Sequence, residues 1–128
     1  MRALLDTHAL LWWLAGDSKL SSAAKPVIAD DLNTIYVSAA SAWEISTKVR
    51  IGKLPGAVEV ADNFARCLNT QGFSELPISV ADGLRAGSMV GDLRDPFDRM
   101  LIAQALSESI PLITNEVIFE SFGVRRLW

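Results

Sequence analysis

The segment from Arg94 to Leu106 constrains the fold most, because an acidic start runs directly into a helix with almost no polar face. Asp95 suits the N-cap position, and Pro96 suits the first helical position, where a missing N–H loses no bond. Asp98 then falls at the third position, near the positive end of the helix dipole. Because apolar residues cover most of the following helix, it must be buried among other elements. We therefore predict a central helix that presents a carboxylate at a buried end.

The composition indicates one domain of ordinary size, residues 1–128, with an apolar surface. Hydrophobic residues make up 50% of the chain and charged residues only 21%, which favours coverage of some surface by another subunit. The 12 basic and 15 acidic residues give a net charge of −3, so no general basic field indicates nucleic-acid binding. A polyanionic substrate would therefore require metal ions or a local basic patch.

The cysteine content and the hydropathy predict a cytoplasmic protein without a membrane segment. Cys67 is the only cysteine, so an internal disulfide and a thiolate metal cluster are both excluded. The start of the chain does not resemble a signal sequence. The longest apolar run, from Ala9 to Ala15, is far shorter than the roughly 20 residues that cross a bilayer.

Strands and helices alternate along the chain, which predicts an α/β fold with a mainly parallel sheet covered on both sides. The strand ending at Pro77 is expected at an edge of this sheet. Phe119 and Phe122 are expected to anchor the core. Strands are predicted at residues 3–5, 34–38, 73–77 and 111–114, with a short last one within 123–128. Helices are predicted at residues 7–14, 21–30, 40–49, 58–71, 79–89 and 95–106.

Two adjacent tryptophans lie in the first predicted helix. Trp12 and Trp13 point about 100° apart on a helix, so both are not expected to face one core. One of them is expected to face a partner. Together with the apolar excess, they predict self-association, most simply as a dimer.

Acidic residues follow the predicted strands. Asp6 comes directly after the first strand, and Glu116 follows the fourth. Ligands of open α/β sheets bind at the carboxyl ends of strands, although Asp6 is equally consistent with a turn residue before a cap at Thr7. Glu44 lies in the early turns of the helix after the second strand, where a solvated partner of Lys48 is the ordinary interpretation.

The carboxyl ends of parallel strands meet at one edge of a sheet, so these acids are expected to converge with Asp98. Four neighbouring carboxylates would raise one another's pKa by several units unless divalent cations neutralised them, which favours a Mg²⁺ or Mn²⁺ site. The oxygen ligands and the missing Cys and His sets exclude zinc. One or two such ions activate water against a phosphodiester, so metal-assisted phosphodiester hydrolysis is the predicted chemistry.

The basic residues and the single histidine leave alternatives open. Lys48, Arg50 and Lys53 form the one compact basic cluster, which is either a solvated face or a contact to a phosphate backbone. His8 is interpreted as a local hydrogen-bonding group rather than a base. A phosphatase that uses an aspartyl-phosphate would need a second Asp two residues after Asp6, where His8 stands.

Three blocks carry a resemblance to a known family: Leu4–Trp12, then Val37–Ile45 with Lys48 and Gly52–Leu54, and finally Arg94–Ala105. They resemble the PIN domain and, within it, the VapC-like toxins of bacterial type II toxin–antitoxin pairs. The resemblance implies a three-layer α/β/α fold and a Mg²⁺-dependent endoribonuclease that is toxic through RNA cleavage. It also implies neutralisation by a small antitoxin that occupies the active site, in a homodimer or a larger complex.

The resemblance assigns catalytic and metal-binding roles to four acids: Asp6, Glu44, Asp98 and Glu116. Candidate supporting residues are Thr7, Asp95 and Thr114. Candidate RNA contacts are Lys48, Arg50 and Lys53.

Two positions depart from the family pattern. Glu116 stands where the family usually has Asp, which keeps the charge but lengthens the arm. Leu93 stands where relatives often have His. The rival interpretation is a PIN-like module that binds RNA or protein in a regulatory role and has lost catalysis. Acids at all four positions favour the enzyme.

Overall fold

A sheet of five strands, all parallel, forms the centre of the computed structural model, which describes residues 1–128. The strand order is β3-β2-β1-β4-β5, so β1 lies in the middle. The parallel pairing predicted from the alternating elements is confirmed. The strands are β1 (Arg2–Leu5), β2 (Thr34–Ser38), β3 (Ser74–Leu76), β4 (Leu112–Ile113) and β5 (Arg126–Leu127). β3 lies at an edge, as Pro77 predicts.

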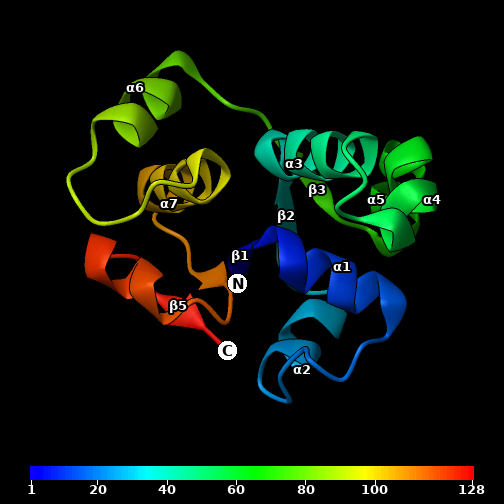
Figure 1. Ribbon diagram of the computed structural model, residues 1–128. Coiled ribbons are helices and arrows are strands. Elements are labelled where there is room, and N and C mark those ends of the chain that lie inside the picture. Colours follow the sequence, from blue (N-terminus) through cyan, green and yellow to red (C-terminus); the bar gives the residue numbers. More distant parts are fainter.

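Helices cover both faces of the sheet, which gives the three-layer α/β/α fold (Figure 1). On one side lie α1 (Thr7–Ala15), α2 (Ala24–Ala29), α3 (Ala39–Arg50), α4 (Val58–Asp62) and α5 (Phe64–Gln71), with the short 3₁₀ helix η1 (Pro55–Ala57) before α4. On the other side lie α6 (Val80–Ser88), α7 (Pro96–Glu108) and the 3₁₀ helix η2 (Val117–Phe122). No helix is long and apolar enough to span a bilayer.

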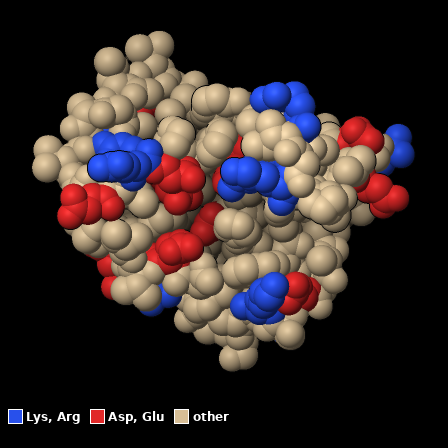
Figure 2. Space-filling model, viewed as in Figure 1, with Lys and Arg blue, Asp and Glu red and all other residues tan.

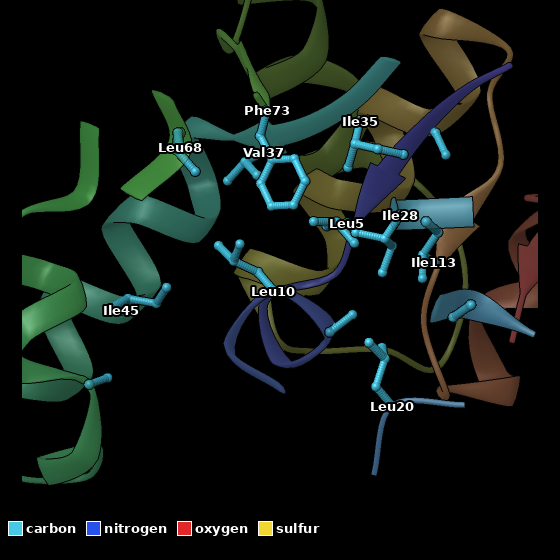
Figure 3. Packing of buried hydrophobic residues seen from close by; sticks show 14 residues of the cluster. Leu5, Leu10, Leu20, Ile28, Ile35, Val37, Ile45, Leu68, Phe73 and Ile113 are labelled. Carbon is cyan, nitrogen blue, oxygen red and sulfur yellow. The ribbon is translucent and has the colours of Figure 1, made fainter. Parts of the chain in front are cut away.

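Alternation along β1 divides the core into two clusters. Ala3 and Leu5 point into a cluster that includes Leu10 of α1 and Ile28 of α2 (Figure 3). Leu4 points the other way, into a cluster that includes buried residues of α7 and Phe119 of η2. The central helix α7 is fully buried along one stretch, from Leu101 to Ala105, as its apolar sequence predicts. Phe119 is fully buried and Phe122 half-buried, so both contribute to the second cluster.

The prediction of one helix over residues 58–71 was wrong. The backbone of Asn63 (φ −130°, ψ 33°) separates α4 from α5. Its side-chain amide donates to the carbonyl of Glu59 at 3.1 Å, a local bond of the kind that competes with helix continuation. The second helix is also shorter than predicted, because the Ser21 hydroxyl accepts from the Ala24 N–H at 3.0 Å and α2 begins only there.

The prediction that Trp12 and Trp13 cannot face one core was also wrong. Both are half-buried and pack against the same cluster. Trp12 lies 5.8 Å from Trp128 and Trp13 lies 6.5 Å from Phe73, measured between ring centroids. Trp128 and Phe73 therefore pack against the two tryptophans, one of which was expected to face a partner.

Candidate functional site

β1 carries Asp6 to the carboxyl edge of the sheet, where neighbouring strands fix it. The side chain is 3% exposed, and its backbone N–H donates to the carbonyl of Ile113 at 3.0 Å. The Thr114 hydroxyl, directly after β4, donates to Asp6 Oδ2 at 2.6 Å. One carboxylate oxygen is thus oriented by the adjacent strand.

Thr7 does not cap α1, contrary to the prediction from the sequence. Asp6 occupies the N-cap position, and its side chain makes no capping bond. The buried hydroxyl of Thr7 instead shares a hydrogen bond of 2.8 Å with the hydroxyl of Ser41. This bond connects the start of α1 to α3, the helix that carries Glu44.

Glu44 is buried, with 3% exposure, so the interpretation as a solvated residue was wrong. Its predicted i,i+4 pair with Lys48 is present, because the Lys48 ammonium donates to Glu44 Oε2 at 2.5 Å. The other oxygen, Oε1, is the one fully buried side-chain polar atom without a hydrogen-bond partner. A buried carboxylate oxygen without a donor is costly, and a bound ligand would satisfy it.

The start of α7 follows the prediction. Asp95 is the N-cap, and its Oδ1 accepts from the N–H groups of Phe97 at 2.9 Å and Asp98 at 3.0 Å. Pro96 takes the first helical position. Asp95 is thereby occupied in capping, whereas the half-buried carboxylate of Asp98 makes no hydrogen bond and remains available to a ligand.

Sequence reasoning missed Arg99, which fastens the loop before α7. Its guanidinium donates to the carbonyls of Ala86 and Leu93, both at 2.7 Å, and to that of Met89. These bonds hold the end of α6 and the following loop against the acidic end of α7. The available signal was the one arginine of this helix, directly before its apolar run.

The electrostatics of the site show that the carboxylates converge. The pKa of Asp98 is raised to about 8, chiefly by burial and then by the negative charges of Asp95, Asp6, Glu44 and Glu116. Three acids from distant parts of the sequence, together with the nearby Asp95, therefore act on one carboxylate. Without a cation, the site disfavours ionisation of Asp98 at neutral pH.

Two further groups respond to this crowding. Burial raises the pKa of Asp6, opposed by the Thr114 hydrogen bond and reinforced by the charge of Glu44. Burial alone would lower the pKa of Lys48, but its bond to Glu44 and the neighbouring carboxylates raise it above the ordinary value. Lys48 is thus a cation held among the acids.

Glu116 lies at the rim of the site. It is exposed at the N-cap position of η2, and its backbone N–H donates to the Thr114 hydroxyl oxygen at 3.0 Å. The structure therefore brings three acids into the interior of the site, namely Asp6, Glu44 and Asp98, and leaves Glu116 outside. Its charge still contributes to the raised pKa of Asp98.

The site lies in a hollow of the surface. Figure 2 shows acidic side chains gathered along this hollow, with basic side chains beside it. Of the predicted basic cluster, only Lys48 bonds to a site acid. Arg50 and Lys53 are exposed at the carboxyl end of α3, and their side chains make no hydrogen bond.

The chemistry of these side chains fits a hard divalent cation. Every candidate ligand is a carboxylate oxygen, and the unpartnered Glu44 Oε1 is an open donor for such an ion. No three acidic, histidine or cysteine side chains are arranged to hold one ion together in this conformation. Occupation would therefore require side-chain movements, and Lys48 is the cation among the acids beforehand.

A family model identifies the fold. The PIN domain model matches residues 3–124. The chain belongs to the PIN domain family. PIN domains are a family of nucleases and generally use divalent metals, which supports a hydrolase that acts on nucleic acid. No curated protein matches the sequence.

Two solved structures share this PIN fold. The chain is similar to a chain in the crystal structure of VapBC2 from Rickettsia felis, which is bound to a DNA fragment from the VapBC2 promoter. The sequence identity is 15%, the TM-score is 0.64, and the match covers 100% of both chains. It is also similar to one in VapBC-1 from nontypeable Haemophilus influenzae, with 17% identity, a TM-score of 0.64 and coverage of 98% and 96%.

Proposed function

We propose that the protein is a Mg²⁺-dependent endoribonuclease and the toxin of a type II toxin–antitoxin pair. The observation that carries this proposal is the convergence of Asp6, Glu44 and Asp98 on one hollow, where an unpartnered oxygen and a pKa of about 8 at Asp98 indicate uncompensated negative charge. A divalent cation is the simplest compensation for this charge.

Each acid has a distinct part in this proposal. Asp6 and Asp98 would hold Mg²⁺, or Mn²⁺ in its place, and Glu44 would offer Oε1 while Lys48 retains Oε2. The cation, when bound, would lower the pKa of a water molecule and neutralise the departing oxygen of a phosphodiester. Glu116 would act from the rim, on a second ion or through an outer contact.

The supporting residues keep these acids in place. Thr114 orients Asp6 through its hydroxyl, and Thr7 connects α1 to α3 through Ser41. Asp95 fixes the amino end of α7, so that the backbone places Asp98 in the hollow. Rigid placement of this kind limits the reorganisation needed during reaction.

RNA would approach through the basic residues at the end of α3 and just after it. Arg50 and Lys53 are exposed and unpaired, so they are free to contact phosphates beside the site. Lys48 would contribute from inside the hollow. Because the net charge is −3, binding would depend on these local cations and on bound metal rather than on an overall field.

The proposal includes a small cognate antitoxin, a cytoplasmic location and a homodimer or a larger complex with the antitoxin. The similarity in fold to chains of two VapBC assemblies supports the antitoxin. The product of a small reading frame beside the gene should co-purify with this protein and suppress its cleavage of RNA. Independent purification of the two proteins, with no inhibition, would contradict this part.

The catalytic proposal is tested with purified protein and bulk cellular RNA. Mg²⁺ should support cleavage, EDTA should stop it, and Asp98→Asn should remove it while the circular dichroism spectrum stays unchanged. Expression of the wild type should arrest bacterial growth, and Asp98→Asn should relieve the arrest. RNA binding without cleavage in Mg²⁺ or Mn²⁺ would instead favour the regulatory binding module.

A further inference from the structure

An aromatic residue directly precedes each of two site acids. Trp43 precedes Glu44 on α3, and Phe97 precedes Asp98 on α7. The two rings meet edge to face, with centroids 4.8 Å apart and planes at 74°. The same two helices that carry the acids thus place an aromatic pair beside them. We refer to Trp43 and Phe97 as the aromatic shelf.

Trp43 is unusual among the tryptophans of this chain. Trp12, Trp13 and Trp128 are half-buried against the core, whereas Trp43 is 61% exposed and its indole N–H makes no hydrogen bond. Burying an aromatic side chain ordinarily gains about 1.5–3 kcal/mol, which this ring largely forgoes in the free protein. Its exposed surface is therefore available to a ligand.

A cavity of about 230 Å³ adjoins the shelf, between α3, α6 and α7. Its walls include Gly83, Ala86 and Gly87, so α6 presents no large side chain on this side. Apart from the adjoining residues and backbone of α6 itself, no atom lies within 4 Å of the position that a Cβ would take at Gly83 or Gly87. The walls therefore leave room for a flat ring next to Trp43 and Phe97.

The surroundings indicate which flat ring would bind. Each residue of the shelf is the sequence neighbour of an acid that would hold the cation, and Lys48 lies one turn after Glu44 on α3 and pairs with it. A ligand that needs cations for its phosphates and an aromatic surface for its rings is a single-stranded nucleic acid. A purely apolar ligand would make no favourable contact with the neighbouring charged residues.

We propose that the aromatic shelf binds a nucleobase of the RNA, next to the phosphate that is cleaved. This inference rests on the proposed ribonuclease function and adds a binding contact to it. Stacking on the shelf would hold the strand in register over the acids without hydrogen bonds to base edges, so it would tolerate different bases and favour purines for their larger surface.

The competing occupant is a second copy of the chain. α6 also exposes Val80 and Leu84, with 83% and 71% of their surface accessible, and these residues would suit a protein interface. Continuity with the acids favours RNA at Trp43, whereas Leu84 has no acid beside it in the sequence. Leu84 therefore serves as the matched control.

The test measures binding of labelled oligoadenylate and oligouridylate by fluorescence anisotropy in Mg²⁺. It uses the Asp98→Asn protein, because this substitution is expected to prevent cleavage of the oligonucleotides. Adding Trp43→Ala should weaken oligoadenylate binding about 5- to 150-fold, the loss expected for one aromatic–base stack of about 1–3 kcal/mol. Trp43→Phe should restore part of the affinity, and oligouridylate should lose less. Adding Leu84→Ala should change neither affinity more than about twofold.

Sedimentation of the same variants identifies the competing outcome. The proposal is overturned if the Asp98→Asn protein binds neither oligonucleotide, or if adding Trp43→Ala leaves its affinity for both unchanged. It is also overturned if Trp43→Ala converts a dimer to a monomer and this conversion accounts for the weaker binding. Cleavage by the wild type, measured separately, tests the proposed function. If the wild type cleaves RNA but Trp43→Ala does not change oligonucleotide binding, only the proposal for the aromatic shelf is refuted. If the wild type cleaves RNA in neither Mg²⁺ nor Mn²⁺, the proposed ribonuclease function is refuted.

Discussion

Asp6 and Glu116 follow neighbouring parallel strands, yet their surroundings differ. Asp6 comes directly after β1, is buried and accepts a hydrogen bond, whereas Glu116 comes three residues after β4 and is exposed at the start of η2. Thr114 contacts both, because its hydroxyl donates to Asp6 and accepts from the backbone of Glu116. The position of the first residue after a strand is thus fixed by the sheet, whereas the position of each later residue depends more on the conformation of the loop.

The largest expected effect comes from the buried side of this comparison. Asp6→Asn or Asp98→Asn should reduce RNA cleavage more than about 100-fold, beyond the 10- to 100-fold typical of residues that contact a metal ligand rather than the metal. Without metal, both variants should melt at or above the wild-type temperature, because a crowded negative charge has been removed. If either variant cleaves RNA as fast as the wild type, the substituted acid is not part of the active site.

Thr114→Val tests the connection between the two regions. The change keeps the shape but removes the donor to Asp6 and the acceptor for the Glu116 N–H. We expect cleavage to fall about 10- to 100-fold and the free energy of unfolding to fall by about 1–3 kcal/mol. Thr114→Ser, which keeps the hydroxyl, is the control and should retain most activity.

Glu116 should give a smaller effect that depends on Mg²⁺. Its long arm starts at the rim, so Glu116→Asp should lower the Mg²⁺ concentration that gives half-maximal cleavage, and Glu116→Gln should lose about 10-fold in activity. Titrations of the three proteins with Mg²⁺ decide this. If the wild type and Glu116→Gln give the same Mg²⁺ titration curve, Glu116 has no part in cleavage, and the active site consists of Asp6, Glu44 and Asp98.

The smallest expected effect is a pH dependence of stability. The pKa of Asp98 is about 8 in the folded protein, above the value of 3.8 for a free side chain, so the native state binds this proton more tightly. The resulting stability is complete below about pH 4 and is lost as the pH rises through 8. Allowing for solvent screening of this half-buried group, we expect a loss of about 1–2 kcal/mol.

Thermal melts of the metal-free protein between pH 5 and pH 9 measure this loss. Asp98→Asn should flatten the curve, and Mg²⁺ should do the same, because a cation favours the ionised carboxylate. A wild-type melting temperature that rises over this range would contradict the crowded, uncompensated site.

The parts of the structure that were predictable from the sequence depend on neighbouring residues. Asp95, Pro96 and Asp98 lie within one helical turn, so their spacing alone specified the cap and the position of the Asp98 carboxylate at the start of the helix. The ends of β1 and β2 were predictable for the same reason, since a short apolar run ends in a polar residue.

The remaining parts depend on packing between distant segments. Glu44 is buried where α1 and α7 pack against α3, which the i,i+4 spacing to Lys48 does not reveal. The placement of Trp12 and Trp13 depended on Trp128 and Phe73, each more than 50 residues away. The contact between Trp43 and Phe97 likewise joins two helices that only the fold brings together.

The three bonds from Arg99 have a consequence for how this protein can diverge. They end on main-chain carbonyls of Ala86, Met89 and Leu93, and every amino acid supplies such a carbonyl. Substitutions in the loop between α6 and α7 would therefore leave these three acceptors in place. A lineage could change the surface chemistry of this loop, and with it the molecules that the loop contacts, while a single arginine keeps the acidic end of α7 in position.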